Sequence, residues 1–206
     1  MQGAQSISNG NRGIGRYTMS LAKALARERG KHELLLVLNG AFPASVERIR
    51  AQFIGLLQQE DIRVWYTQPP MAYVEPGSAW LRQSGELVRE AFIASLNPDF
   101  VLLSSLFEGL IDDAVTSLKR FDGQYMTAVI LYDLIPFLHR QPYLENPLVE
   151  AWYLEKIEHL QRADLWLAIS ESSSQEGVEY LDLPSARCVN ISTDADAHFQ
   201  KIAVSA

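Results

Sequence analysis

Cysteine and long hydrophobic runs are scarce in this sequence, and each shortage excludes a class of protein. Cys188 is the only cysteine, so no disulfide can form within the chain, and we expect it to be a small buried residue of a strand. No apolar run approaches the roughly 20 residues that a membrane-spanning helix needs. Because no secretory signal is recognisable either, the sequence favours a reducing compartment. It therefore predicts a cytoplasmic protein that is soluble or peripheral to a membrane.

Positive charge and metal-ligand spacings are also scarce. Eighteen Lys and Arg residues against 25 Asp and Glu residues give a formal net charge of -7. This balance argues against a broad basic face, so we expect no nucleic-acid partner, and any anionic ligand has to be held locally. The four histidines are scattered without the spacing of a zinc site, so no metal is expected.

Short apolar runs alternate with segments of helical periodicity along the chain. The expected strands are 34–38, 62–66, 100–103, 126–131, 165–169 and 187–191, and the expected helices are 17–29, 46–58, 80–96, 112–119, 148–162 and 172–180. Parallel strands need helix-length connections, so this alternation is typical of a parallel sheet. The sequence predicts an α/β fold over 1–191, doubly wound and Rossmann-like, with a mostly parallel sheet and helices on both faces.

The two ends of the chain look incomplete. A polar, glycine-bearing loop, 2–15, has no strand before it, although such loops normally follow the first strand of a Rossmann-like sheet. We therefore expect a missing first strand, and pairing of the open strand edges in a homodimer is one alternative. The segment 192–206 has neither periodicity nor a cap, so we expect a linker or a disordered tail.

A glycine-containing segment stands directly before the first expected helix. Its residues are Arg12, Gly13, Ile14, Gly15 and Arg16. Glycines allow close approach of an anion, and the free N–H groups and positive dipole end of a helix favour phosphate. The spacing differs from the full dinucleotide fingerprint, and a tight turn without any ligand explains the glycines equally well.

Polar residues also follow three of the expected strands, where open α/β sheets bind ligands. Tyr132 and Asp133 follow the strand 126–131, and Asp133 suits either sugar binding and proton transfer or the capping of a turn. Ser170 and Glu171 follow the next strand, and Ser170 suits either the N-cap of a helix or a ligand contact. Glu108 suits either a ligand contact or a solvated loop carboxylate.

Three motifs, in this order and spacing, resemble one family. The segments 13–18 (GIGRYT), 132–136 (YDLIP) and 168–172 (AISES) are similar to the amino-terminal half of bacterial group 1 glycosyltransferases, family 4, which have the two-lobed GT-B fold. The segments 2–6 and 105–109 also resemble a subgroup that builds cell-surface polysaccharide, often as mannosyltransferases. The resemblance covers nearly the whole chain.

The resemblance implies retaining transfer of a sugar from a nucleotide-sugar to a polysaccharide or lipid-linked acceptor, without a metal or other cofactor. Residues 12–16 would approach the donor phosphates, and Asp133 with Tyr132 would face the reacting sugar as catalytic residues. Tyr132 stands where many relatives have histidine, which argues against imidazole chemistry at this position. The acceptor-side residues would be Glu108, Ser170 and Glu171. A lipid-linked acceptor would bring the enzyme to the inner face of the cell membrane.

The family's second, carboxy-terminal lobe has no counterpart here, and 192–199 resembles the linker between the lobes. We therefore expect the 206 residues alone to be catalytically inactive. The alternative from another class is a non-enzymatic Rossmann-like module that binds a nucleotide or sugar phosphate. Both hypotheses require Gly13, Gly15, Glu108, Asp133 and Ser170 to face a common crevice.

Overall fold

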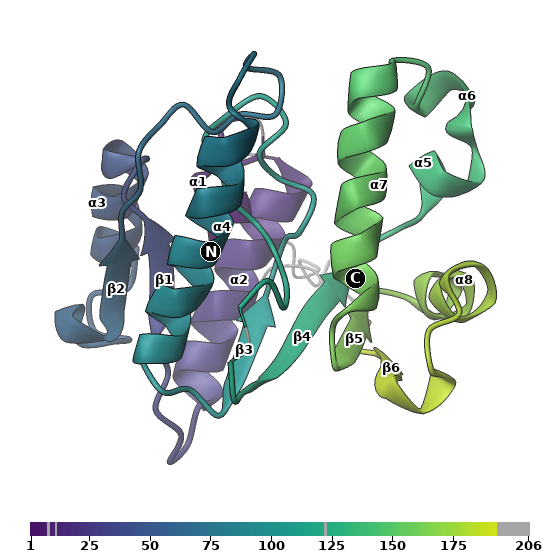
Figure 1. Cartoon of the computed structure of the whole chain (residues 1–206). Helices are drawn as coiled ribbons and strands as arrows, with labels where there is room; N and C mark the ends of the chain where they lie inside the picture. The colour runs from purple at the N-terminus through teal and green to yellow at the C-terminus, as the bar shows by residue number, and fades with distance from the viewer. Residues whose placement is uncertain (8, 11, 122, 193–206) are drawn as a thin grey trace, which may run out of the picture.

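A computed structural model describes residues 1–7, 9, 10, 12–121 and 123–192 of the chain (Figure 1). The expected linker or tail at 192–206 therefore lies, apart from its first residue, outside the described residues. No helix in the described part is both long enough and apolar enough to cross a membrane.

All described strands pair in parallel, but they form two sheets. The strands are β1 (Leu36–Asn39), β2 (Ile62–Trp65), β3 (Phe100–Leu103), β4 (Met126–Leu131), β5 (Leu165–Ala168) and β6 (Cys188–Asn190). One sheet has two strands in the order β1-β2, and the other has four in the order β3-β4-β5-β6. The Rossmann-like α/β class is confirmed, since parallel sheets are flanked by helices. The division into two sheets was not expected. Cys188 is half-buried at the start of β6.

The longer helices lie close to their expected positions. The helices are α1 (Gln2–Gln5), α2 (Gly13–Glu28), α3 (Pro43–Gln52), α4 (Ala79–Ser95), α5 (Ile135–Leu138), α6 (Arg140–Tyr143), α7 (Pro147–Gln161) and α8 (Glu171–Leu181). Gly30, with φ +55°, follows the end of α2, as expected of a glycine stop. Asn146 caps α7 by accepting a hydrogen bond from the N–H of Leu148.

The helix expected at 112–119 is wrong, because this segment is an irregular buried loop. Side chains from distant elements satisfy its backbone groups. The side-chain amide of Gln2 donates to the carbonyl of Val115, and its oxygen accepts from the N–H of Val115 at 2.7 Å. Lys156 donates to the carbonyl of Thr116 at 2.6 Å. Buried backbone groups need partners, and here these partners come from tertiary contacts instead of a helix.

Hydrophobic residues form separate clusters on the two sides of the fold. The largest packs the four-stranded sheet against α7 and α8, and another packs β1 and β2 against α2 and α3. A small third cluster centres on Trp65, Met71 and Val115. Figure 1 shows the same division, with α7 and α8 beside β4 to β6 and the other long helices around β1 and β2.

The short helix α1 stands at the carboxyl ends of strands from both sheets. Gln5 donates to the carbonyl of Asn39 at 3.0 Å and accepts from its N–H at 2.8 Å, at the end of β1. A Cβ on Gly3 would lie 2.7 Å from the Cβ of Ser105, which follows β3. The polar segment expected to be a loop thus contains a helix that joins the two strand ends.

Candidate functional site

The amino terminus of α2 is exposed and carries positive charge. Arg12 occupies the N-cap position without a side-chain hydrogen bond to the helix, and no acidic residue lies in the first turn. Arg12, Gly13 and Arg16 are exposed, and Ile14 is half-buried. The first N–H groups of a helix lack intrahelical partners and bear partial positive charge. This end of α2 can therefore accept an anion between two guanidinium side chains.

The two glycines of this segment have different structural roles. A Cβ on Gly15 would lie 2.3 Å from the carbonyl oxygen of Asn9 and 2.6 Å from that of Gly10, so packing requires glycine there. A Cβ on Gly13 would meet nothing within 4 Å. Gly15 lies within α2 and not in the tight turn considered from the sequence, and its packing against the preceding loop needs no ligand. Gly13 borders open space at the start of α2.

Tyr132 connects the end of β4 to β3 and α2. Its hydroxyl donates to the carbonyl of Ser104 at 2.9 Å, and its ring contacts Tyr17 edge-on with centroids 5.9 Å apart. Burial is the main cause of a raised pKa for Tyr132, so the hydroxyl keeps its proton. Tyr132 therefore fixes the relative position of three elements.

Glu108 is buried, with 2% of its surface exposed, so the solvated-carboxylate alternative is wrong. One carboxylate oxygen accepts from the Ser105 hydroxyl at 2.6 Å, and the other accepts from the Asn9 amide at 2.9 Å. Burial raises the pKa of Glu108, and these hydrogen bonds oppose the rise. The contact with Asn9 joins the loop after β3 to the segment before α2, whereas Ser105 belongs to the same loop as Glu108. Asn9 was missed as a site residue because its role depends on this long-range contact.

Asp133 lies exposed immediately after the end of β4. One carboxylate oxygen accepts from the N–H of Ile135 at 3.1 Å, which is the turn-capping arrangement considered from the sequence. The other oxygen, Oδ2, has no hydrogen bond within the described part of the chain. Asp133 is consequently both a local cap and a carboxylate available to solvent.

Ser170 is the N-cap of α8, because its hydroxyl oxygen accepts from the N–H of Ser173 at 3.1 Å. The capping interpretation is confirmed. Glu171 is exposed and accepts from the side-chain amides of Gln175 at 3.2 Å and Asn190 at 3.3 Å. Asn190 ends β6, so Glu171 links α8 to the next strand end, a contact that the sequence did not indicate.

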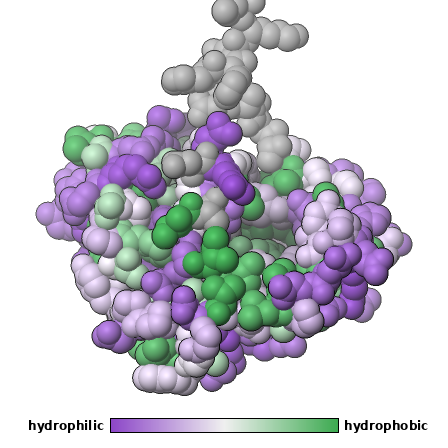
Figure 2. Space-filling view, turned by 90° about the horizontal axis from the view of Figure 1, so that it is seen from above, coloured by the Kyte–Doolittle hydropathy of each residue, from purple (hydrophilic) through white to green (hydrophobic). Residues whose placement is uncertain are grey.

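These residues follow neighbouring strand ends, but only some of them are in contact. Tyr132 contacts the first turns of α2 through Tyr17, and Glu108 contacts the segment before α2 through Asn9. Asp133 is adjacent in sequence to Tyr132, and Ser170 follows β5, which pairs with β4 through Leu131 and Ala168. Figure 2 views the molecule from above the strand ends of Figure 1 and shows apolar side chains across the middle of this face, with polar ones around them. The candidate site is the edge of the fold formed by these neighbouring strand ends and the start of α2.

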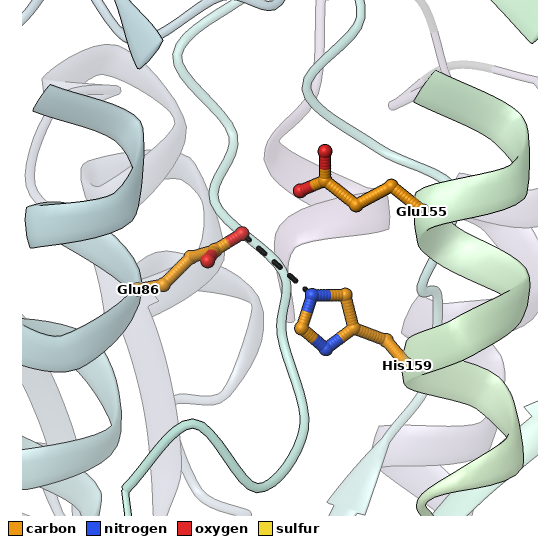
Figure 3. A group of neighbouring side chains, drawn as sticks. All are labelled: Glu86, Glu155 and His159. Atoms are coloured by element: carbon orange, nitrogen blue, oxygen red, sulfur yellow. Dashed lines mark ion pairs between the residues drawn. The ribbon is translucent and has the colours of Figure 1, made fainter. Parts of the chain in front are cut away.

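A second group of polar residues lies between α4 and α7 (Figure 3). Glu86, Glu155 and His159 each offer an atom within 4.8 Å of the others, a spacing compatible with a metal ion. However, Arg120 contacts Glu86 at 2.9 Å. Burial raises the pKa of Glu86, and the positive charges of Lys156 and Arg120 oppose this rise. Glu86 therefore already has cations beside it. Burial first, then Lys156, lowers the pKa of His159 to about 3, so this imidazole is neutral.

Relatives were found over the whole chain. It is 33% identical to the serotype-specific mannosyltransferase WbdA of Escherichia coli over an alignment of 207 residues, which covers the whole chain and 24% of that protein. Two further proteins of this name from the same organism are 31% and 30% identical over 90% of the chain and 23% of their own length. No protein-family model and no solved structure matches. The chain thus spans about a quarter of these relatives, which confirm the resemblance to glycosyltransferases.

Proposed function

We propose that residues 1–191 form the acceptor-side lobe of a retaining glycosyltransferase that transfers a sugar from a nucleotide-sugar to a polysaccharide or lipid-linked acceptor. Mannose is the proposed sugar, because the matched relatives are named mannosyltransferases. The observation that carries the proposal is the exposed start of α2, without a side-chain cap and flanked by Arg12 and Arg16. Such a terminus favours a phosphate group.

In this proposal, residues 12–16 bind the donor phosphates, and open space at Gly13 allows close approach. Asp133 orients the reacting sugar or transfers a proton through its free carboxylate oxygen. Tyr132 and Glu108 act as positioning residues, because their hydrogen bonds are made within the protein. The Tyr132 hydroxyl donates to a backbone carbonyl, and the Glu108 carboxylate accepts from two side chains. The acceptor meets the exposed Glu171 beside Ser170.

The activity requires partners outside the described chain. A carboxy-terminal lobe, joined through 192–206, would supply most nucleotide contacts, so we propose that the 206 residues bind phosphate weakly and do not catalyse transfer. A lipid-linked acceptor would place the whole enzyme in the cytoplasm at the inner face of the membrane. No metal is needed in this scheme, because the arginines and the helix terminus provide the positive charge.

The test measures inorganic pyrophosphate binding by isothermal titration calorimetry. Replacing both arginines (Arg12→Ala with Arg16→Ala) should weaken binding about tenfold or more, since a charged hydrogen bond contributes about 1.5–3 kcal/mol. Arg27→Ala is the matched control, because Arg27 is exposed in the last turn of the same helix. Equal affinity in both variants would contradict the phosphate site.

A second experiment separates the enzyme from a non-enzymatic binding module. In a protein that also contains the carboxy-terminal lobe, Asp133→Asn should lower the rate of sugar transfer about 10²-fold or more. Pyrophosphate affinity and the free energy of unfolding should change little. Phosphate binding without any transfer by the unsubstituted two-lobed protein would favour the module.

A further inference from the structure

A cavity of about 490 Å³ lies between the two sheets. Residues 32–37, which include the start of β1, line one wall, and residues 96–104, which include all of β3, line the other. Side chains of α2 and α4, among them Leu21 and Ile93, also line it. We call this space the β1–β3 slot.

Both walls of the β1–β3 slot carry a strand edge that lacks a neighbour. Among the described residues, β1 pairs with β2 alone and β3 pairs with β4 alone. Each strand therefore presents a row of backbone N–H and C=O groups that no other strand satisfies. Buried backbone groups of this kind need partners, and proteins normally pair or cover such edges.

The hydrophobic core is interrupted at the same place. Leu103 of β3 belongs to the cluster around the four-stranded sheet, whereas Leu36 of β1 and Ala22 of α2 belong to the other large cluster. An apolar element in the slot would contact both clusters. It would thereby complete one continuous core, as expected of a single domain.

The chain reaches the carboxyl-end side of the slot at Met1. Met1 and Gln2 line the slot, together with Ser104 just after β3. Gln2 and Gln5 bind Asn39, the last residue of β1, and Gly3 packs against Ser105. A strand that filled the slot parallel to β1 and β3 would thus end beside Met1. Burial also lowers the pKa of the Met1 amino group to about 5, a cost that an uncharged peptide nitrogen at this position would avoid.

We propose that the β1–β3 slot holds one extended apolar strand, parallel to β1 and β3, whose carboxyl end is joined to Met1. With this strand in place, the two sheets become one sheet in which β1 and β3 flank the new strand. Since β1 and β3 have four residues each, the new strand has about four to six. A central parallel strand is covered on both faces, so its side chains are apolar. A small apolar ligand would fill the volume but would leave the two backbone edges unpaired.

The test compares two amino-terminal extensions of the 206-residue chain. One adds Val-Ile-Val-Ile-Val before Met1, and the matched control adds Val-Pro-Val-Pro-Val, in which proline removes alternate N–H donors. The first should raise Tm by about 5 °C or more over the control. It should also slow amide hydrogen exchange in β1 and β3 at least tenfold, while exchange in β6, at the outer edge of its sheet, stays the same.

Equal Tm and equal exchange in β1 and β3 for the two extended proteins would overturn the proposal. If the chain without extension is insoluble, soluble folded protein from the Val-Ile extension alone supports the proposal, and equal yields oppose it. Light scattering detects the other source of a strand, because a dimer that persists with the Val-Ile extension would show that a second copy fills the slot. The outcome is independent of pyrophosphate binding, so it does not depend on the proposed function.

Discussion

Acid should destabilise this protein through His159, and the effect can be calculated from its surroundings. The side chain is 1% exposed, and burial with the nearby Lys156 lowers its pKa from 6.5 to about 3. Between these two values the unfolded chain binds a proton that the folded protein excludes, so the free energy of unfolding falls as pH decreases. Each pH unit within this window lowers the free energy of unfolding by about 1.4 kcal/mol. The total loss between pH 6.5 and 4.5 is roughly 2–3 kcal/mol.

The assay is urea unfolding, followed by circular dichroism, at pH steps from 7 to 4.5. His159→Gln removes the titrating group and should flatten the dependence on pH over this window by most of the calculated amount, whatever the substitution costs at pH 7. The raised pKa of Glu86 acts with the opposite sign, but Glu86 is present in both proteins. His32→Gln is the control, because His32 is exposed. An unchanged slope in His159→Gln would refute the assignment of a neutral, buried imidazole.

Three further predictions follow from individual contacts. Gly15→Ala should lower the free energy of unfolding by about 1–3 kcal/mol, because the added Cβ would overlap the carbonyls of the preceding loop. Gly13→Ala should change it by less than about 0.5 kcal/mol, and thermal unfolding measures both variants. Ser170→Ala should cost about 1 kcal/mol and Ser170→Gly only a few tenths in urea unfolding, and equal costs would argue against the cap. Lys156→Met should cost about 2 kcal/mol or more, because it leaves the buried carbonyl of Thr116 without its donor and removes a cation near Glu86, whereas Lys119→Met, in an exposed ion pair, should cost at most about 1 kcal/mol. Similar losses in the two lysine variants would contradict the contrast between buried and exposed charge.

The strands could be predicted from the sequence because each is an apolar run bounded by turn residues. Every expected strand overlaps one in the structure, and the longer helices follow their apolar periodicity. The segment 112–119 could not be predicted this way. Its apolar residues have helical spacing, yet they are buried as a loop whose backbone binds Gln2 and Lys156 from distant parts of the chain. Periodicity reports burial on one face and carries no information about such partners.

The site shows the same limit at the level of side chains. The motifs lie at the carboxyl ends of strands, where ligand sites of open α/β sheets are found. They could not separate residues that face solvent, such as Asp133, from residues held inside, such as Glu108. The difference depends in part on Asn9, which reaches Glu108 only after the segment before α2 folds against the loop after β3.

The helix α2 connects the proposed phosphate site with the β1–β3 slot. Its first turn presents Arg12 and Arg16 to solvent, and one turn later Thr18 and Leu21 line the slot. Gly15, between these two surfaces, presses against the loop that precedes α2. A strand in the slot would hold one face of α2 and, through Met1, the segment leading into its amino terminus. We therefore expect the geometry of the proposed phosphate site to depend on a part of the sheet that would not contact phosphate, because α2 borders both.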